Sequence, residues 1–278
     1  MSEEVIRGRL HQFLLPIPYS IIFGQDPLIQ EFERSPDPIK RFIFHNPPFY
    51  DEIMEFCDGS LYKFSQIYKE SKELFSETDM EECFDKLSAE GVVDTDYVHQ
   101  AERAVQTFPF NEYALRYLIE IHHLSVLAGR KLALPCLEYS IFALMINPSS
   151  ERWRVYATEM TVRLGWWQEA IMLANPTFTM AMMTGGDPAW NYQGMAACAQ
   201  AIIGLLDSHF AANRPGLPEL NEPISAFERL DSTIRLFKTY AKLSARNSED
   251  EHKDQEMANQ FEEQANRLRN FAQNTGRL

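Results

Sequence analysis

The chain has 278 residues, 45% of them hydrophobic and 12% aromatic, a composition typical of a folded globular protein rather than a disordered one. Its 40 acidic and 26 basic side chains give a formal net charge of −14, which argues against nucleic-acid binding because that affinity rests on Lys and Arg. The sequence carries neither a secretory signal pattern nor an uninterrupted apolar stretch of about 18 residues, so we expect no membrane segment.

The first 46 residues contain short apolar or β-branched runs separated by Pro, Gly and Asp. These runs predict strands at residues 10–15, 19–23, 28–32 and 39–45. From Pro48 the apolar residues recur at helical spacing, which predicts three short helices. Thr78 or Asp79 is expected to cap the third helix and Gly91 to end it. A three- or four-stranded antiparallel sheet followed by three helices predicts an α+β, winged-helix-like module over residues 1–96.

Beyond residue 96 the pattern is helical throughout. Helices are predicted at about residues 95–106, 111–127, 134–145, 151–164, 167–174, 188–211, 224–245 and 249–273. Two glycines that end helices, Gly129 and Gly165, are 36 residues apart, close to the roughly 34-residue period of tetratricopeptide repeats. Residues 97–278 are therefore predicted to form an all-α, tetratricopeptide-like helical domain.

Charge divides unevenly between these two regions. Residues 1–96 hold 20 acidic and 9 basic groups, so most of the net negative charge belongs to the predicted winged-helix-like module. Only Lys86 lies in its presumptive recognition helix. Both features argue against a winged helix that binds DNA.

The sequence shows no catalytic motif. Its seven histidines never form HxH, HxxH or HExxH spacing, no GxSxG or phosphate loop occurs, and the four cysteines are isolated from one another. We therefore expect a chain that is not an enzyme and that holds no cofactor or metal of its own. Isolated thiols in an acidic chain favour a reducing cytoplasm.

Residues 150–200 are unusually rich in Trp and Met. A packed helical core explains about half or more of them. Trp166 and Trp167 are adjacent on a helix start and cannot both face one core, so Trp166, Trp167 and Trp190 are candidates for a partner interface.

Four short motifs occur in order over residues 5–96. They are a predicted strand ending at Asn46, a helix closing on Cys57-Asp58-Gly59, a helix carrying Ile67, and a last helix with Leu87 four residues before Gly91. Together they resemble the PqqD-like RiPP recognition element, the domain that binds leader regions of ribosomally made, post-translationally modified peptides. The sequence departs from that family in its extended region before residue 39 and in the two prolines after Asn46.

The resemblance implies where a peptide would bind. In that family the peptide adds as a strand beside the third strand and the third helix, with side-chain pockets giving specificity. Carried over by position, the implied peptide-binding residues are Ile39, Lys40, Arg41, Phe42, Ile43, Phe44, His45, Met80, Cys83, Phe84 and Leu87. Lys40 and Arg41 would meet acidic side chains of a leader; as the alternative, they are ordinary charges protecting an edge strand.

A recognition element fused to a helical domain is similar to the partner subunits of multinuclear non-haem iron oxidases of the DUF692 type. The resemblance implies a cytoplasmic heterodimer in which this chain presents the reactive residue, a Cys, of a precursor or carrier peptide, as in the 3-thiaglutamate pathway. Iron would belong to the partner oxidase. Two alternatives remain: a tetratricopeptide-like scaffold or regulator whose winged-helix module binds protein or DNA, and a catalytic subunit with a site built from scattered residues.

Overall fold

The computed structural model describes residues 2–13, 58, 60–127, 133–146, 150–174, 188–211, 223–245 and 248–276. These residues form helices joined by short turns, and no strand occurs among them. In chain order the helices are α1 (Glu3–Phe13), α6 (Leu61–Leu74), α7 (Glu77–Glu90), α8 (Thr95–Thr107), α9 (Glu112–Leu127), α10 (Ala133–Ile146), α11 (Glu151–Arg163), α13 (Pro188–Ala211), α14 (Pro223–Ser244) and α15 (Ser248–Asn274). Residues 167–174 are also helical. The helices predicted beyond residue 96 are confirmed to within one residue at each end.

Local capping chemistry sets the ends of α7. The Ser76 hydroxyl accepts a hydrogen bond from the backbone N–H of Asp79, and the Asp79 carboxylate accepts one from the backbone N–H of Ser76. This reciprocal pair is a capping box, so the N-cap is Ser76 rather than Thr78 or Asp79. Gly91 ends the helix as predicted, with a left-handed φ of 65° that glycine adopts at little cost.

The chain divides into two compact units, Met1–Tyr156 and Ala157–Leu278. The boundary that the sequence predicts at residue 96 lies inside the first unit, in the first turn of α8. Helices α6 and α7, which precede that position, pack against α8 and α9, which follow it. The separate roles expected for residues 1–96 and 97–278 stay a prediction.

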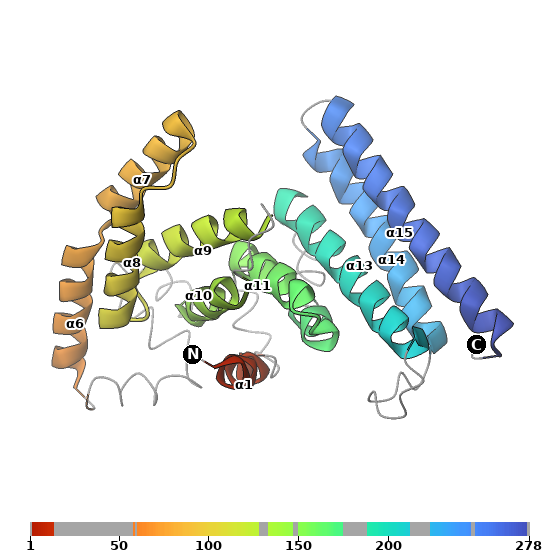
Figure 1. The fold of residues 1–278 in the computed structure, drawn as a ribbon, viewed down its shortest axis with the longest axis horizontal. Helices are drawn as coiled ribbons and strands as arrows, with labels where there is room; N and C mark the ends of the chain where they lie inside the picture. The colour runs from red at the N-terminus through yellow and green to blue at the C-terminus, as the bar shows by residue number, and fades with distance from the viewer. Residues whose placement is uncertain are drawn as a thin grey trace, which may run out of the picture. The chain divides into compact units, whose positions relative to one another are not determined.

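Alternate helices of unit 1 pack against each other. Helix α6 lies beside α8, α7 beside α9, and α8 and α9 pack on each other (Figure 1). Leu61 and Thr95 begin alternate helices 34 residues apart, and Glu77 and Glu112 do so 35 residues apart. This spacing is that of helical repeats whose successive hairpins bury a shared core. This spacing is present from α6 onward, before the region in which the sequence predicts a tetratricopeptide-like repeat.

Asn111 is fully buried and links α6, α8 and α9 through hydrogen bonds. Its side-chain amide donates to the backbone oxygens of Ser71 (3.0 Å) and Phe75 (3.1 Å) at the end of α6. Its side-chain oxygen accepts from the backbone N–H groups of Tyr113 and Ala114, which caps α9. The Ser71 hydroxyl in turn donates to the carbonyl of Ala104 in α8. One polar network therefore joins three helices.

Unit 2 contains α13, α14 and α15, which pack side by side (Figure 1). Phe237 of α14 meets Phe261 of α15 edge-on at 5.6 Å, and Phe210 of α13 stacks on Phe227 of α14 at 6.2 Å. Burying one such side chain stabilises the fold by about 1.5–3 kcal/mol. The buried alanines of α15 recur every seven residues and let α15 approach its neighbours closely: Ala258, Ala265 and Ala272.

The prediction of an N-terminal winged-helix-like module with an antiparallel sheet is wrong, and with it the α+β fold class. The first predicted strand, residues 10–15, begins inside α1. Ile6 and Leu10 lie four residues apart and are both fully buried, a helical spacing, and α1 packs against α10. The predicted strands at residues 19–23, 28–32 and 39–45 lie outside the described residues. Where residues 2–96 are described, they form helices that pack against α8, α9 and α10 rather than against a sheet.

Candidate functional site

Four residues of the predicted peptide-binding set lie on α7. Met80 and Cys83 are buried, Phe84 and Leu87 are half-buried, and α7 packs against α9. The ring of Phe84 meets the ring of Tyr117 on α9 edge-on at 5.9 Å. Phe84 therefore helps to hold α7 on α9. Ile39, Lys40, Arg41, Phe42, Ile43, Phe44 and His45 lie outside the described residues.

Cys83 and Tyr117 form a buried polar pair in this contact. Burial raises the pKa of the Cys83 thiol to about 11, although its hydrogen bond with Tyr117 lowers that pKa. Burial also raises the pKa of the Tyr117 hydroxyl above its usual value. The thiol is thus held protonated, which makes it a packing group rather than a nucleophile.

The opposite face of α7 is exposed and rich in carboxylates. Its acidic side chains include Glu81, Glu82 and Asp85. Lys86 lies over the ring of Tyr97 at 4.7 Å and pairs with Asp94 at 3.6 Å. The Tyr97 hydroxyl donates to Glu82 at 3.0 Å. These contacts link α7 to the start of α8.

Of the two adjacent tryptophans of the predicted partner interface, Trp166 is buried and Trp167 packs against α13. Trp166 is buried, with 6% of its surface exposed. Trp167 is half-buried, lies against Gly204, and donates from Nε1 to the Ser208 hydroxyl at 3.2 Å. The backbone of Trp190 lies in α13, and its side chain is not among those described.

A cleft in the described part of the chain lies between α14 and α15. It measures about 520 Å³, within the range of small ligand sites. Its lining residues are Glu228, Asp231, Ser232, Ile234, Arg235 and Glu262. Ile234 is the buried apolar member, and the others bear polar or charged groups. The cleft is therefore a polar groove with an apolar base.

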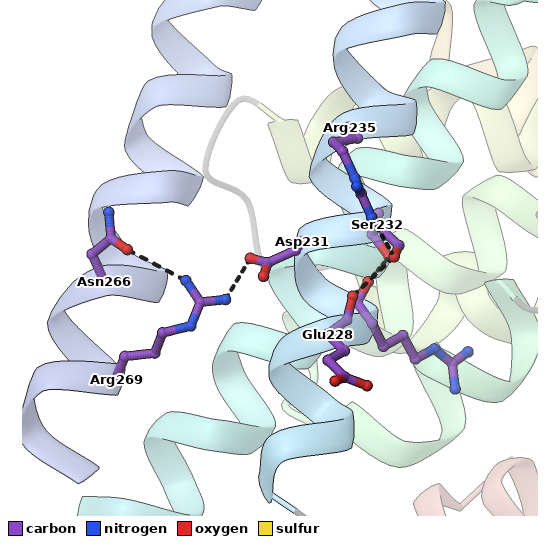
Figure 2. A network of polar contacts seen from close by, with 8 residues as sticks. Glu228, Asp231, Ser232, Arg235, Asn266 and Arg269 are labelled. Carbon is purple, nitrogen blue, oxygen red and sulfur yellow. Dashed lines mark hydrogen bonds and ion pairs between the residues drawn. The ribbon is translucent and has the colours of Figure 1, made fainter. Parts of the chain in front are cut away.

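Two ion pairs between α14 and α15 lie at this cleft. Arg269 donates to Asp231 at 2.5 Å and to the side-chain oxygen of Asn266 at 3.3 Å (Figure 2). Lys238 donates to Glu262 at 2.6 Å. Each pair joins one residue of α14 to one of α15, so both pairs hold the two helices in register.

Two charged side chains of the cleft, Glu228 and Arg235, form no ion pair with another described residue. Arg235 donates to the Ser232 hydroxyl at 3.1 Å, and Ser232 donates to the backbone oxygen of Glu228 at 2.9 Å (Figure 2). Within the described ranges, Arg235 has no carboxylate partner and the Glu228 carboxylate has no side-chain partner. Each of these two side chains is available to an external group of opposite charge.

Sequence reasoning did not single out this cleft. A signal was present, because Glu228, Asp231, Ser232 and Arg235 follow one another at the 3, 4 and 7 spacing of one helix face. The same spacing relates Glu262, Asn266 and Arg269 on α15. The sequence could not show that these two faces lie against each other.

Metal binding, membrane spanning and similarity to known proteins each bear on what the chain can do. Among the described residues, no three His, Cys, Asp or Glu side chains gather in a way that could hold a metal ion. None of the helices described there combines the length and apolar character needed to cross a bilayer. No protein-family model matches the chain, and no curated protein sequence or solved structure matches it either.

Proposed function

We propose that this chain is a non-catalytic recognition subunit that binds a precursor or carrier peptide and presents its reactive residue to a partner enzyme. The observation that carries the proposal is the packing of alternate helices in unit 1, α6 on α8 and α7 on α9, whose starts lie 34 and 35 residues apart. Hairpin stacks of this period offer extended surfaces that bind peptides and proteins. The proposal therefore rests on the arrangement of the helices, and the motif resemblance to peptide-recognition elements supports it.

Recognition is placed on helices rather than on a sheet edge. The antiparallel sheet expected at the N-terminus is absent from the described residues, so peptide binding by strand addition is not part of the proposal. Helix α7 carries four residues of the motif resemblance, and the face it turns away from α9 is exposed. As the motif resemblance implies, Lys40 and Arg41 would meet acidic side chains of the peptide.

The partner in this proposal is an iron-dependent oxidase of the DUF692 type, in the cytoplasm and in a heterodimer. The recognition subunit would hold the peptide beside the oxidase and leave the chemistry to the iron. Holding two reactants together raises their effective concentration and removes the entropic cost of their encounter. The reactive group would be a Cys, as in the pathway to 3-thiaglutamate.

Fluorescence anisotropy tests the binding step. The probe is a fluorescein-labelled synthetic peptide corresponding to the short reading frame that neighbours the gene. We expect saturable binding that weakens about tenfold or more when Lys40 and Arg41 are both changed to Glu, because two favourable charge contacts become repulsive. A matched double variant, Lys242→Glu with Lys253→Glu, reverses two exposed charges of unit 2 and should leave binding unchanged.

A protein scaffold is the second candidate, because the same helix arrangement serves scaffolds equally well. The two functions differ in what the partner does. For a recognition subunit, adding this chain raises the partner's turnover of the full peptide and not of a peptide lacking its leader. Peptide binding that is absent, or equally strong in the Lys40/Arg41 variant and the control, would exclude the recognition subunit.

A further inference from the structure

Glu228 and Arg235 lie on one exposed face of α14 and carry opposite charges. They are seven residues apart, which is two helical turns or about 10.5 Å along the axis. Neither has an ion-pair partner within the described ranges, whereas the cleft's other charges, Asp231 and Glu262, are paired with Arg269 and Lys238. Among the residues that the structure describes, this face thus presents one anion and one cation without an ion-pair partner, two helical turns apart.

Such a pair is self-complementary. If two identical helices meet antiparallel across a two-fold axis, each residue on one side of the axis faces its counterpart on the other side. An axis passing near Asp231 and Ser232 brings Glu228 of each copy opposite Arg235 of the other. Two identical ion pairs then form at once, and no charge of this helix face is left over.

We propose that the α14 face is a docking surface for a second copy of this chain, with the two α14 helices antiparallel and paired through Glu228 and Arg235. The concave cleft of about 520 Å³ beside α14 receives side chains of the other copy, and Ile234 lies at its base. The internal pairs Asp231–Arg269 and Lys238–Glu262 keep the surrounding charges neutral, so they do not oppose the approach. This self-association is independent of peptide binding.

Analytical ultracentrifugation of the full chain at about 100 μM tests the proposal, since a contact with micromolar affinity is occupied at that concentration. We expect a dimer at low salt that dissociates as salt is raised. Each single reversal, Glu228→Arg or Arg235→Glu, should weaken dimerisation by about tenfold or more, because it replaces both ion pairs by like-charge contacts. The double variant exchanges the two charges and should restore the dimer.

Glu263→Arg is the control, since Glu263 is exposed on α15 outside the cleft; it should leave the dimer intact. All the substituted positions are exposed, and circular dichroism verifies that each variant folds. A chain that is monomeric at low salt overturns the proposal. So does a dimer that the single reversals leave unchanged, or one that the double variant fails to restore.

Discussion

The indole of Trp167 lies directly against Gly204 of α13. A Cβ built on Gly204 would come within 2.8 Å of three atoms of that ring, a distance that real Cβ contacts do not reach. The indole is also held by its hydrogen bond to Ser208 four residues further along α13. Gly204 is therefore present because only a residue without a side chain lets the tryptophan pack flat on the helix.

Gly204→Ala should lower the free energy of unfolding by about 1–2 kcal/mol, because the overpacking cost exceeds the gain in helix propensity. Urea unfolding followed by circular dichroism measures the change. Gly8→Ala is the matched control: Gly8 is exposed in α1 and nothing lies within 4 Å of its added Cβ, so Ala should be neutral or stabilising there. Equal stability of the two variants would contradict the packing explanation.

Asn111→Ala should destabilise unit 1 by about 3 kcal/mol. The substitution removes the cap of α9 and the hydrogen bonds that the Asn111 amide donates to the carbonyls of Ser71 and Phe75. Asn111→Ser keeps a capping oxygen but not the donor, so its loss should be smaller, about 2 kcal/mol. Asn266→Ala, which removes one exposed acceptor, should change stability by less than about 0.5 kcal/mol. If Asn111→Ala loses no more stability than Asn266→Ala, the polar network of Asn111 does not hold these helices together.

Cys83 should resist alkylation in the folded chain. Its raised pKa of about 11, two units above the ordinary value of 9.0, reduces the thiolate at pH 8 about 100-fold. Mass spectrometry of peptides alkylated with iodoacetamide, with and without denaturant, measures this difference directly. Tyr117→Phe removes a hydrogen bond that lowers the Cys83 pKa, so native labelling should become slower still. Native labelling as fast as that in denaturant would show that the thiol is accessible and ionised.

His122 should make stability depend on pH. Burial lowers its pKa below 6.5, outweighing the hydrogen bond to Leu118 and the charge of Glu102, which raise it. Because the folded pKa is below the unfolded one, the unfolded chain binds the proton first. The contribution of neutral His122 to the free energy of unfolding is therefore fully present above pH 6.5, and it is lost as pH falls through the folded pKa.

Unfolding free energies of the wild type and of His122→Gln, compared from pH 7 to pH 5, isolate this effect. The wild type should lose more stability than the variant over that window, by at most about 1.4 kcal/mol per pH unit for one proton. His99→Gln is the control, because the His99 side chain is 73% exposed. Identical pH slopes for wild type and His122→Gln would show that His122 is not held neutral by the fold.

Much of the helical architecture could be predicted because its signals are local. The helix at Thr95 is capped by Asp94, and the one before it ends at Gly91 in a left-handed conformation. Apolar spacing at 3.6 residues marks the faces that become buried. The error at the N-terminus has the opposite origin. Leu10 begins a short apolar run, and only its burial together with Ile6, four residues earlier on a helix that packs against α10, shows that this residue belongs to a helix.

The candidate site depended on contacts that no local signal specifies. Asp231 and Arg269 are 38 residues apart, and their pairing, with that of Lys238 and Glu262, exists only because α14 and α15 lie side by side. Likewise, Asn111 finds acceptors 36 and 40 residues away. By itself, then, the sequence determined where most helices begin and end, since capping and periodicity act within a few residues. The tertiary structure decided which faces meet and which charges stay unpaired, because these depend on packing between residues far apart along the chain.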